Sequence, residues 1–307
     1  MKYFLNQFIK NIMKIGIATC EKLPDLYESD KALIPLFAER NIEAVPVIWN
    51  DPSVNWLQFD FVVIRTTWDY FQHQAAFTAW LNYLETNGIK LFNPVSVVRK
   101  NSHKFYLKEL QEKGIEIIPT VFIDKTNRLD LSIVQTNNWE QAVLKPAVSA
   151  GSYMTRLFKA EEFKAVETEF KSIAENTDLL LQPFMPEINT FGELSLIFFN
   201  RKFSHSVLKV PQKGDFRVQW QYGGKYQAFS PDSSIIETAE NIISHVKEEE
   251  LLYARIDGVI KNDRFLLMEM ELIEPDLYFD HHASAKKTFV DSVAELAFNK
   301  VFEKKTS

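Results

Sequence analysis

Apolar residues recur along the first third of this chain in two alternating patterns, continuous runs and runs with helical spacing. The continuous runs predict buried strands at residues 14–19, 44–49, 59–65 and 90–92. The helical spacing predicts helices at residues 29–40 and 74–86. Strands that alternate with helices in this way indicate a small parallel α/β sheet.

In the rest of the chain, predicted strands often follow one another directly. Strands are predicted at residues 115–122, 142–146 and 179–182, and pairs of strands around a turn at residues 193–210 and 253–272. Helices are predicted at residues 102–113, 161–175, 238–250 and 285–300. The last strand pair has the pattern of a hairpin, because Asn262 and Asp263 form a turn between its halves.

This hairpin carries three carboxylates that are candidates for a metal site. Side chains alternate across a strand, so Glu269 and Glu271 share one face and the apolar residues beside them share the other. Asp257, on the preceding strand, can lie next to the two glutamates. Carboxylates packed this closely repel one another unless a cation or protons compensate, and Mg²⁺ prefers oxygen ligands of this kind. From the pattern alone, a metal site and a solvated polar face are equal alternatives.

The composition limits the class of protein. The chain has 307 residues, 46% hydrophobic and 25% charged, which is enough for two or three hydrophobic cores. Its net charge of −6 and pI of about 5.6 argue against nucleic acid or an anionic membrane as the main partner. The single cysteine, Cys20, excludes an internal disulfide, and no apolar run reaches the length of a membrane span. We therefore expect a cytoplasmic protein.

Four polar and aromatic residues follow the third predicted strand at its carboxyl end: Arg65, Trp68, Asp69 and Tyr70. Ligands gather at the carboxyl ends of strands in open α/β sheets. An exposed loop of this composition is therefore a candidate substrate site. The alternative is a turn with a capping aspartate and a packed tryptophan, and we favour the substrate site.

Two lysines and a loop of small residues are candidates for binding phosphate. Lys145 ends a predicted strand and precedes residues 149–152, whose backbone N–H groups suit a phosphate. Lys104 opens a predicted helix. The strand at residues 179–182 runs into a proline-bounded linker, which either offers backbone groups to a purine edge or is a plain domain hinge. Each of these features is unremarkable by itself.

Two arginines add to this set. Arg217, in the sequence GDFR, and Arg255, two residues before Asp257, can each clamp a phosphate or a carboxylate through two hydrogen bonds. Taken singly, each is more often a salt-bridge partner. The functional interpretation rests on the order of these features along the chain. The two lysines come first, the second with its loop of small residues. The apolar linker, the two arginines and the acidic residues follow.

In this order the chain resembles the ATP-grasp superfamily of ligases, from about Arg99 to the end. The resemblance implies an α/β protein with an ATP-grasp fold, whose central lobe is residues 99–182 and whose C-terminal lobe is residues 183–307. It also implies that residues 13–98 form the parallel α/β domain that usually precedes this fold. We expect residues 1–12 to be an extension, and whether Met1 or Met13 is the native start stays open at this stage.

The resemblance also implies roles for particular residues. The nucleotide-binding set would be Lys104, Lys145, Ser149, Gly151, Ser152, Gln182, Pro183, Phe184, Glu193 and Lys209. The transferred phosphate would be contacted by Arg217 and Arg255. Two Mg²⁺ ions, with Mn²⁺ as an alternative, would be bound by Asp257, Glu269 and Glu271. The substrate would be bound by Arg65, Trp68, Asp69, Tyr70 and Glu274.

Within the superfamily, several short motifs indicate a subgroup. GDFR resembles the ribosomal-protein glutamate ligase branch, and ARID resembles the D-alanine–D-alanine ligases. The combination of TTWDY, NSHKFYL, KGDFRVQWQYGG and MELIEP is most similar to the cycloserine-forming enzymes. Glu271 departs from the pattern, because most members carry Asn there. Glu274 stands where glutathione synthetase-like enzymes have a Ser near the substrate, so the resemblance does not identify the substrate.

The function implied by the resemblance is an ATP-dependent ligase that joins a carboxylate to an amine through an acyl phosphate, releasing ADP and phosphate. The substrate would be an amino acid or a small peptide. One alternative is ATP-driven cyclisation of an amino-acid derivative, and another is a non-catalytic nucleotide-binding protein, against which the intact lysines, arginines and acids argue. We expect small-molecule carboxylate and amine partners, no nucleic acid or membrane partner, and a homodimer as an option that fits the superfamily.

Overall fold

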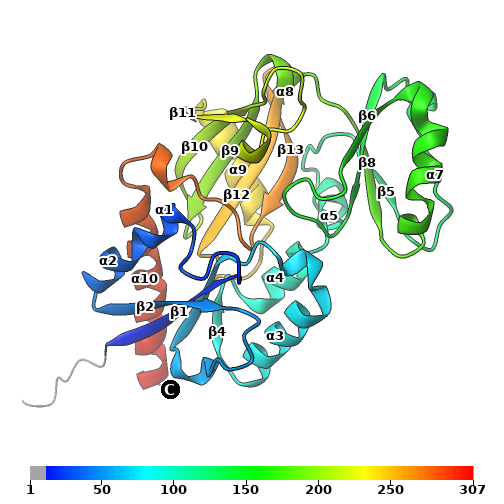
Figure 1. The fold of residues 1–307 in the computed structure, drawn as a ribbon. Coiled ribbons are helices and arrows are strands. Elements are labelled where there is room, and N and C mark those ends of the chain that lie inside the picture. The colour runs from blue at the N-terminus through cyan, green and yellow to red at the C-terminus, as the bar shows by residue number, and fades with distance from the viewer. Residues whose placement is uncertain (1–11, 307) are drawn as a thin grey trace, which may run out of the picture. The chain divides into compact units, whose positions relative to one another are not determined.

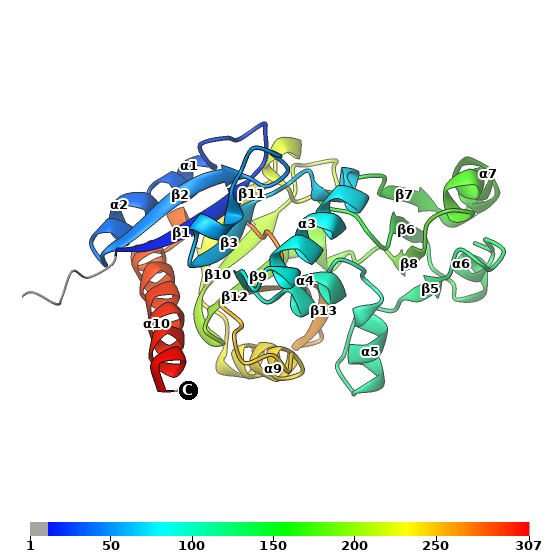
Figure 2. The same cartoon turned by 90° about the horizontal axis from the view of Figure 1, so that it is seen from below.

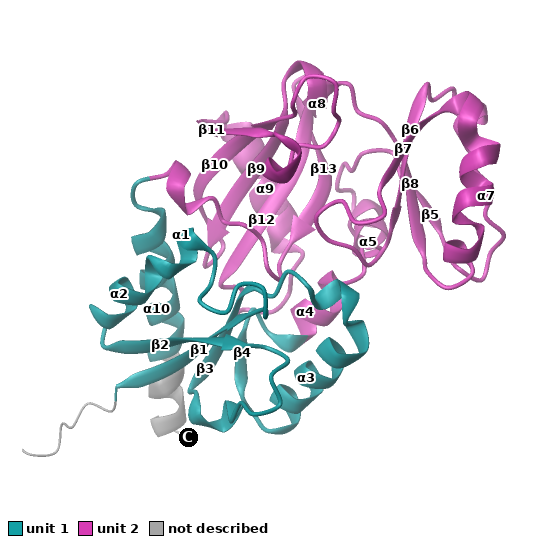
Figure 3. Ribbon diagram, viewed as in Figure 1, with its two compact units in different colours: residues 1–95, 283–307 teal, residues 96–282 magenta. Residues whose placement is uncertain are grey.

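The computed structural model describes residues 12–306, and their side chains as far as residue 298. The chain divides into two compact units, unit 1 with residues 1–95 and 283–307 and unit 2 with residues 96–282 (Figure 3). The extension expected at residues 1–12 lies outside the described residues except for Ile12. The lobe boundaries at residues 99 and 183 stay predictions. No helix in the described part of the chain is both long and apolar enough to cross a membrane.

Unit 1 is built on a parallel sheet in the order β2–β1–β3–β4, which confirms the α/β pattern. Its strands are β1 (Met13–Thr19), β2 (Ile42–Ile48), β3 (Phe61–Thr66) and β4 (Lys90–Phe92). Its helices are α1 (Glu28–Lys31), α2 (Leu33–Ala38), α3 (Gln74–Thr86) and α10 (Ala285–Thr306). The single helix predicted at residues 29–40 is two helices, because Pro35 has no N–H to donate to Lys31 and its ring crowds that turn.

The larger sheet of unit 2 is antiparallel, in the order β11–β10–β9–β12–β13. Its strands are β9 (Glu193–Phe199), β10 (Lys202–Val210), β11 (Lys225–Phe229), β12 (Tyr253–Lys261) and β13 (Arg264–Glu271). Helix α9 (Ser233–Ser244) covers one face of this sheet (Figure 2), where Ile235 and Ile242 pack in one core with Leu194, Leu196 and Leu267. The opposite face carries polar side chains, among them Ser195 and Asp257, together with a second apolar core that includes Val259.

The smaller sheet of unit 2 is also antiparallel, in the order β5–β8–β6–β7. Its strands are β5 (Val121–Ile123), β6 (Gln141–Pro146), β7 (Arg156–Lys159) and β8 (Leu179–Pro183). Helix α7 (Phe163–Ala174) lies along one face of it (Figure 1), with Val166 and Phe170 against Leu144 and Leu179. Unit 2 also contains the short helices α6 (Ile133–Thr136) and α8 (Glu187–Thr190), and the chain has 3₁₀ turns at 56–58, 70–72, 160–162, 220–222 and 279–281.

Two helices of unit 2 differ from the prediction, and each difference has a local cause. The helix predicted at residues 102–113 is replaced by α4 (Val95–Asn101) and α5 (Tyr106–Glu112), because the backbone N–H of Lys104 bonds to Ala147 instead. Helix α9 ends at Ser244, earlier than predicted. The Arg201 guanidinium binds the carbonyl groups of Ile243, Val246 and Glu248, which draws the chain out of the helix there.

Candidate active site

The hairpin of β12 and β13 places the predicted acidic residues side by side. Asp257 is the cross-strand neighbour of Glu269, and Arg255 is the neighbour of Glu271. The turn between the strands is tight, with φ of 51° at Asn262 and 59° at Asp263. Two positive φ angles match the turn type that fits the twist of a two-residue hairpin. The predicted hairpin turn is therefore confirmed, and so is the position of Asp257 beside Glu269.

A bulge next to Asp257 sets which side chains of β13 face the site. The register shifts between Asp257 and Gly258, so that Met268 is an extra residue on β13. A Cβ at Gly258 would lie 2.4 Å from the Leu266 carbonyl oxygen, so the bulge requires glycine. Because of the shift, Met270 packs in the large core, whereas Met268 packs in a separate one. Simple alternation would have placed these two methionines together.

Asp257 is buried and is bound by three different side chains. It accepts hydrogen bonds from the Ser195 hydroxyl, from Lys209 Nζ at 3.3 Å and from Arg255 Nε at 3.0 Å. Burial raises the pKa of Asp257, but the charges of Arg255 and Lys209 outweigh it and hold the pKa at about 2. Asp257 is therefore an anion at neutral pH, with two cations beside it.

Lys209 on β10 links Asp257 to Glu193, the first residue of β9. Its ammonium group is buried and donates to Glu193 as well as to Asp257. Burial lowers the pKa of Lys209, but the charges of Asp257 and Glu193 raise it well above its usual range. Burial raises the pKa of the Glu193 carboxyl despite this contact. Glu193 and Lys209, both predicted to bind the nucleotide, therefore belong to the Asp257 cluster.

Arg255 links Asp257 to Glu271. Its guanidinium donates to Asp257, to the Glu271 carboxylate and, at 3.0 Å, to the carbonyl oxygen of Asp276, and it lies 5.4 Å from the centre of the Tyr278 ring. Burial raises the pKa of Glu271 to about 7, with Glu269 and Asp257 adding to the effect and Arg255 opposing it. The extra carboxylate noted in the sequence is thus paired with an arginine.

The two predicted phosphate-binding lysines lie near the same carboxylates, Lys104 between helices α4 and α5 and Lys145 on β6 of the smaller sheet. Lys104 Nζ lies 2.9 Å from Glu269 Oε1 and donates to the Ser149 carbonyl oxygen at 2.6 Å. Burial lowers the pKa of Lys145, and the charge of Glu269 opposes this effect. Burial raises the pKa of Glu269, but Lys104 and Lys145 together lower it below its usual range. The lysines and the acids therefore form one electrostatic cluster.

This cluster has more acidic than basic groups. The acidic side chains are Asp257, Glu193, Glu269, Glu271 and Glu274, and the basic ones are Lys104, Lys145, Lys209 and Arg255. Burial raises the pKa of Glu274 well above its usual range, and the nearby Glu271 adds to this. The other acids include Asp257 and Glu269, which the cations keep ionised. A dense set of carboxylate oxygens of this kind fits a divalent cation such as Mg²⁺.

The carboxylates do not form a ready-made metal cage. Across the described residues, no group of three or more His, Cys, Asp or Glu side chains is arranged to hold a metal ion. The reason lies in the contacts just given, because Glu269 faces Lys104 and Glu271 faces Arg255. The donor chemistry fits a divalent cation, but Glu269 and Glu271 are paired with basic side chains in this arrangement.

The small-residue loop and the apolar linker lie beside this cluster in the smaller sheet. The loop turns sharply, with φ of 59° at Gly151 and 63° at Ser152, and the Ser149 hydroxyl donates to the Pro146 carbonyl oxygen at 3.1 Å. In the linker, the Gln182 amide donates to the Thr120 hydroxyl at 2.9 Å, so this side chain points into the protein. Pro183 and Phe184 are half-buried, and a role of this linker in binding a purine stays a prediction.

Arg217 stands apart from the cluster in its contacts. It makes a two-pronged ion pair with Asp215, two residues earlier, with Nε to Oδ1 at 3.0 Å and Nη2 to Oδ2 at 2.8 Å. Its guanidinium carbon lies 3.6 Å from the centre of the Tyr222 ring. The backbone N–H groups of Phe216 and Arg217 also donate to Asp215. GDFR is therefore a compact turn that holds its own arginine, and a role for Arg217 at the phosphate stays a prediction.

The predicted substrate residues of unit 1 are engaged in contacts within that unit. Arg65 is 1% exposed, and its Nε donates to Asp30 at 2.6 Å. Asp69 accepts a hydrogen bond from the Trp49 indole at 2.8 Å, and Trp68 packs against Tyr27. Tyr70 is buried. These contacts match the alternative of a packed turn, and a role in binding substrate stays a prediction.

Sequence reasoning missed several residues that shape the site. Ser195 binds Asp257, and its position two residues after Glu193 on one strand was a usable signal. Asp215 was missed although it lies inside the quoted GDFR motif. Asn101 and Tyr106 lie inside NSHKFYL and bind the backbone of β13. In both motifs the basic residue was predicted to be functional, and the neighbouring residues that shape the site were not.

Two family models match the chain, one for each part. The model of the prokaryotic glutathione synthetase ATP-grasp domain matches residues 103–276, which is more than half of the chain. The model of the N-terminal domain of D-cycloserine synthetase DcsG matches residues 15–93. The first range contains the acidic cluster, and the second contains most of the parallel sheet of unit 1.

Curated relatives cover most of the chain at low identity. The cycloserine biosynthesis protein DcsG of Streptomyces lavendulae is 24% identical over 259 residues, covering 80% of this chain and 86% of the relative. The glutathione synthetase of Prochlorococcus marinus subsp. pastoris is 26% identical over 219 residues, covering 71% of this chain and 68% of the relative.

Solved structures show the same fold. D-cycloserine synthetase DcsG matches with a TM-score of 0.83 at 22% identity, over 92% of this chain and 99% of the other. A D-alanine–D-alanine ligase from Bacillus anthracis matches with a TM-score of 0.64 at 15% identity, over 95% and 99%. The resemblance seen in the sequence is confirmed, and this chain belongs to the ATP-grasp family of ligases, enzymes that use ATP and divalent metal ions to form carbon–nitrogen bonds.

Proposed function

We propose that this enzyme activates a small carboxylic acid, an amino acid or a short peptide, as an acyl phosphate and passes the acyl group to an amine. The observation that carries the proposal is the acid-rich cluster on β9, β12 and β13. In it, Lys104 is held against Glu269, and Arg255 is held against Glu271 and Asp257. The cluster thus places basic groups that suit phosphates in direct contact with acidic groups that suit a metal ion.

A nucleoside triphosphate would rearrange the ion pairs of this cluster without any change of fold. Its phosphate oxygens attract Lys104, Lys145 and Arg255, which are the charges that now neutralise the carboxylates. Asp257, Glu269 and Glu271 would then be free to hold divalent cations, two in our proposal. When bound, such ions neutralise the charge of the transferring phosphate. Binding of ATP and binding of the metal ions would therefore each promote the other.

The chemical step needs little from the protein beyond position and charge. A substrate carboxylate oxygen attacks the γ-phosphorus of ATP in line, the bond to the β-phosphate oxygen breaks, and ADP leaves. Arg255 and, after release from Asp215, Arg217 stabilise the charge on the transferred phosphate. The amine nitrogen then attacks the acyl carbon, the bond to phosphate breaks, and the nitrogen loses a proton. The products are an amide, ADP and phosphate.

A second candidate is the same activation followed by attack from an amine within the same molecule, which closes a ring. It is favoured by the match of residues 15–93 to the DcsG N-terminal model and by the TM-score of 0.83 to D-cycloserine synthetase. Both candidates use one acyl phosphate and one site. They differ in whether a second substrate is needed.

The experiment begins with calorimetry of Mg²⁺–ATP binding and continues with a screen for ADP release. Amino acids and dipeptides are supplied singly and in pairs. Ligation predicts that release requires a pair, and cyclisation predicts that one amino-acid derivative suffices. If Mg²⁺–ATP binds and none of the amino acids or dipeptides, singly or in pairs, stimulates ADP release, the proposed substrate class is wrong.

We also propose a cytoplasmic location, because the single cysteine suits a reducing compartment. The proposed partners are small molecules, and a homodimer is the assembly that we would test first. Light scattering of the purified chain gives the mass that decides between monomer and dimer.

A further inference from the structure

The outer edge of β13 is held by two side chains that no proposed step uses. The Tyr106 hydroxyl donates to the Met270 carbonyl oxygen at 2.9 Å and accepts from the Met270 N–H at 2.8 Å. The Asn101 amide donates to the same carbonyl at 2.7 Å and accepts from the Leu272 N–H at 2.8 Å. β13 is the last strand of its sheet, so its outward backbone groups need such partners.

The peptide groups held in this way flank the acidic residues. Met270 lies between Glu269 and Glu271, and Leu272 follows directly. On the inner side, β12 pairs with Glu269, Met270 and Glu271. The backbone around Glu271 is therefore held by β12 on one side and by Asn101 and Tyr106 on the other. The path of this backbone determines where the Glu269 and Glu271 carboxylates point.

A cavity behind the strand increases the importance of these hydrogen bonds. It has a volume of about 250 Å³, and its walls include Asn101, Tyr106, Met270 and Leu272. Met270 and Leu272 pack in the large core, and the cavity leaves space beside them. Hydrogen bonds from Asn101 and Tyr106 therefore add to packing in holding the strand.

The same short segment carries Lys104. Between Asn101 and Tyr106, the Lys104 ammonium contacts Glu269, and its backbone N–H bonds to the Ala147 carbonyl oxygen. The motif NSHKFYL thus combines a phosphate-binding candidate with two anchors for the strand that carries the acids. This explains why the chain leaves the helix between residues 102 and 105.

We propose that Asn101 and Tyr106 are positioning residues that fix Glu269 and Glu271 in the geometry a divalent cation requires. The inference rests on the metal site of the proposed function. It predicts a defect in metal affinity, separate from any loss of stability.

The test measures Mn²⁺ binding in the presence of ADP, by calorimetry, for the wild type and four variants. Tyr106→Phe keeps the ring and removes the hydroxyl, and Asn101→Ala removes the other anchor. Tyr253→Phe is the matched control, because its buried hydroxyl donates to the Ile273 carbonyl oxygen at 2.7 Å, outside β13. Glu269→Ala tests the metal site itself. Circular dichroism and thermal melting report the fold of each variant.

We expect Tyr106→Phe and Asn101→Ala each to weaken Mn²⁺ binding by about tenfold, the lower end of the range for residues that orient metal ligands. Tyr253→Phe should stay within about twofold of the wild type on the same scale. If Glu269→Ala loses Mn²⁺ binding but both anchor variants keep it, the inference is wrong and the metal site stands. An equal loss in Tyr253→Phe also overturns the inference. Unchanged binding in Glu269→Ala refutes the metal site and the inference with it.

Discussion

Two buried arginine–aspartate pairs, one in each unit, are alike as contacts and differ in their surroundings. In unit 1, Arg65 and Asp30 are 2.6 Å apart with side chains 1% and 3% exposed, and the guanidinium lies against the Phe289 ring. In unit 2, Arg255 and Asp257 are 2.9 Å apart with side chains 9% and 4% exposed. The second arginine also binds Glu271, and the second aspartate also binds Lys209.

This difference in surroundings distinguishes a structural ion pair in unit 1 from a candidate active site in unit 2. The pair in unit 1 is closed from solvent and holds β3 to helix α1. The pair in unit 2 belongs to a cluster with more acids than bases, which is stable only with further positive charge or bound protons. Burial raises the pKa of Glu271 to about 7 and that of Glu274 well above its usual range, so part of this cluster holds protons where the pair in unit 1 does not need them.

The largest expected effect follows from breaking the buried pair in unit 1. Asp30→Ala leaves the Arg65 charge buried without its carboxylate, which should lower the free energy of unfolding of unit 1 by about 3–5 kcal/mol. Asp291→Ala is the control, since Asp291 and Arg40 also lie 2.6 Å apart but are 41% and 29% exposed. The control should lose less than about 1 kcal/mol. Equal losses in urea denaturation of the two variants would refute the structural role of the buried pair.

Arg217 offers a third arginine–aspartate pair, in an exposed turn rather than in a core. Its side chain is 34% exposed, so Arg217→Ala should change stability by less than about 1 kcal/mol. ADP release should nevertheless fall by about a hundredfold, because a charge on the transferred phosphate is lost. The measurement is steady-state ADP release with a confirmed substrate. Near-normal turnover would remove Arg217 from the mechanism.

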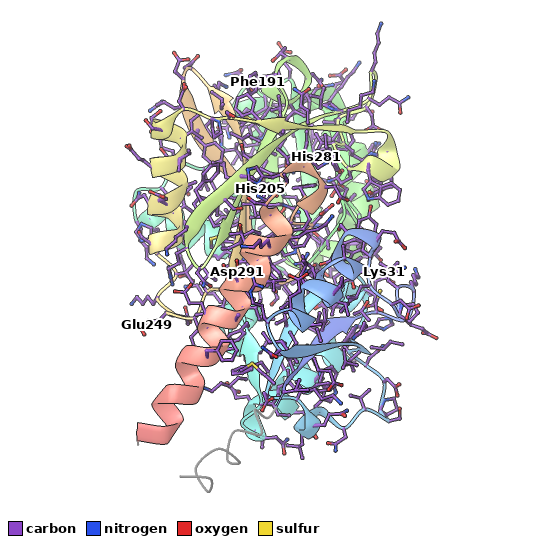
Figure 4. All side chains as sticks on the ribbon, turned by 90° about the vertical axis from the view of Figure 1, so that its left-hand side faces the viewer. Lys31, Phe191, His205, Glu249, His281 and Asp291 are labelled. Carbon is purple, nitrogen blue, oxygen red and sulfur yellow. The ribbon has the colours of Figure 1, made fainter. Side chains whose placement is uncertain are left out.

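His205, labelled in Figure 4, shows how burial changes the pKa of a basic group whose two ring nitrogens contact a hydroxyl and a backbone carbonyl. It is 4% exposed, its Nε2 bonds to the Leu277 carbonyl oxygen at 2.9 Å, and its ring stacks on His282. Burial lowers its pKa from 6.5 to about 4. The unfolded chain therefore binds a proton between pH 6.5 and 4 that the folded chain does not, so stability falls as the pH drops through this window.

The size of this effect is about 2 kcal/mol between pH 7 and pH 5, from the shift in pKa. His205→Gln should abolish this part of the pH dependence while the rest of the acid response remains. Urea denaturation at the two pH values measures it. Equal pH dependence in the variant and the wild type would contradict the lowered pKa.

Local patterns in the sequence predicted the strands of unit 1 and the hairpin of β12 and β13, because their apolar runs and the Asn262–Asp263 turn are complete within the segment. β7 and β11 were missed, since they are short and half-exposed and have no apolar run. The break at Lys104 was also missed, because it depends on Ala147, which is distant in sequence.

The acids of the site were found from spacing and the basic residues from the resemblance, but the contacts between them were not predicted, and Ser195 was missed. Glu269 and Glu271 follow from alternation along one strand, and Asp257 follows from the hairpin. Their contacts to Ser195, Lys209 and Lys104 come from other strands and loops. The same limit applies to Arg65, whose partner Asp30 lies 35 positions earlier in the chain. A sequence shows which charges are present, and the fold decides which of them neutralise each other.

The central claim is that the surplus carboxylates of unit 2 bind a divalent cation together with a nucleotide. The most direct test is calorimetry of ADP binding with Mg²⁺ and with a chelator, for the wild type and for Glu269→Ala. Glu116→Ala is the control, because Glu116 pairs with the exposed Arg264, which lies on β13 like Glu269. We predict that Mg²⁺ strengthens ADP binding in the wild type and the control, and that Glu269→Ala loses most of this gain. An undiminished gain in Glu269→Ala would contradict the account.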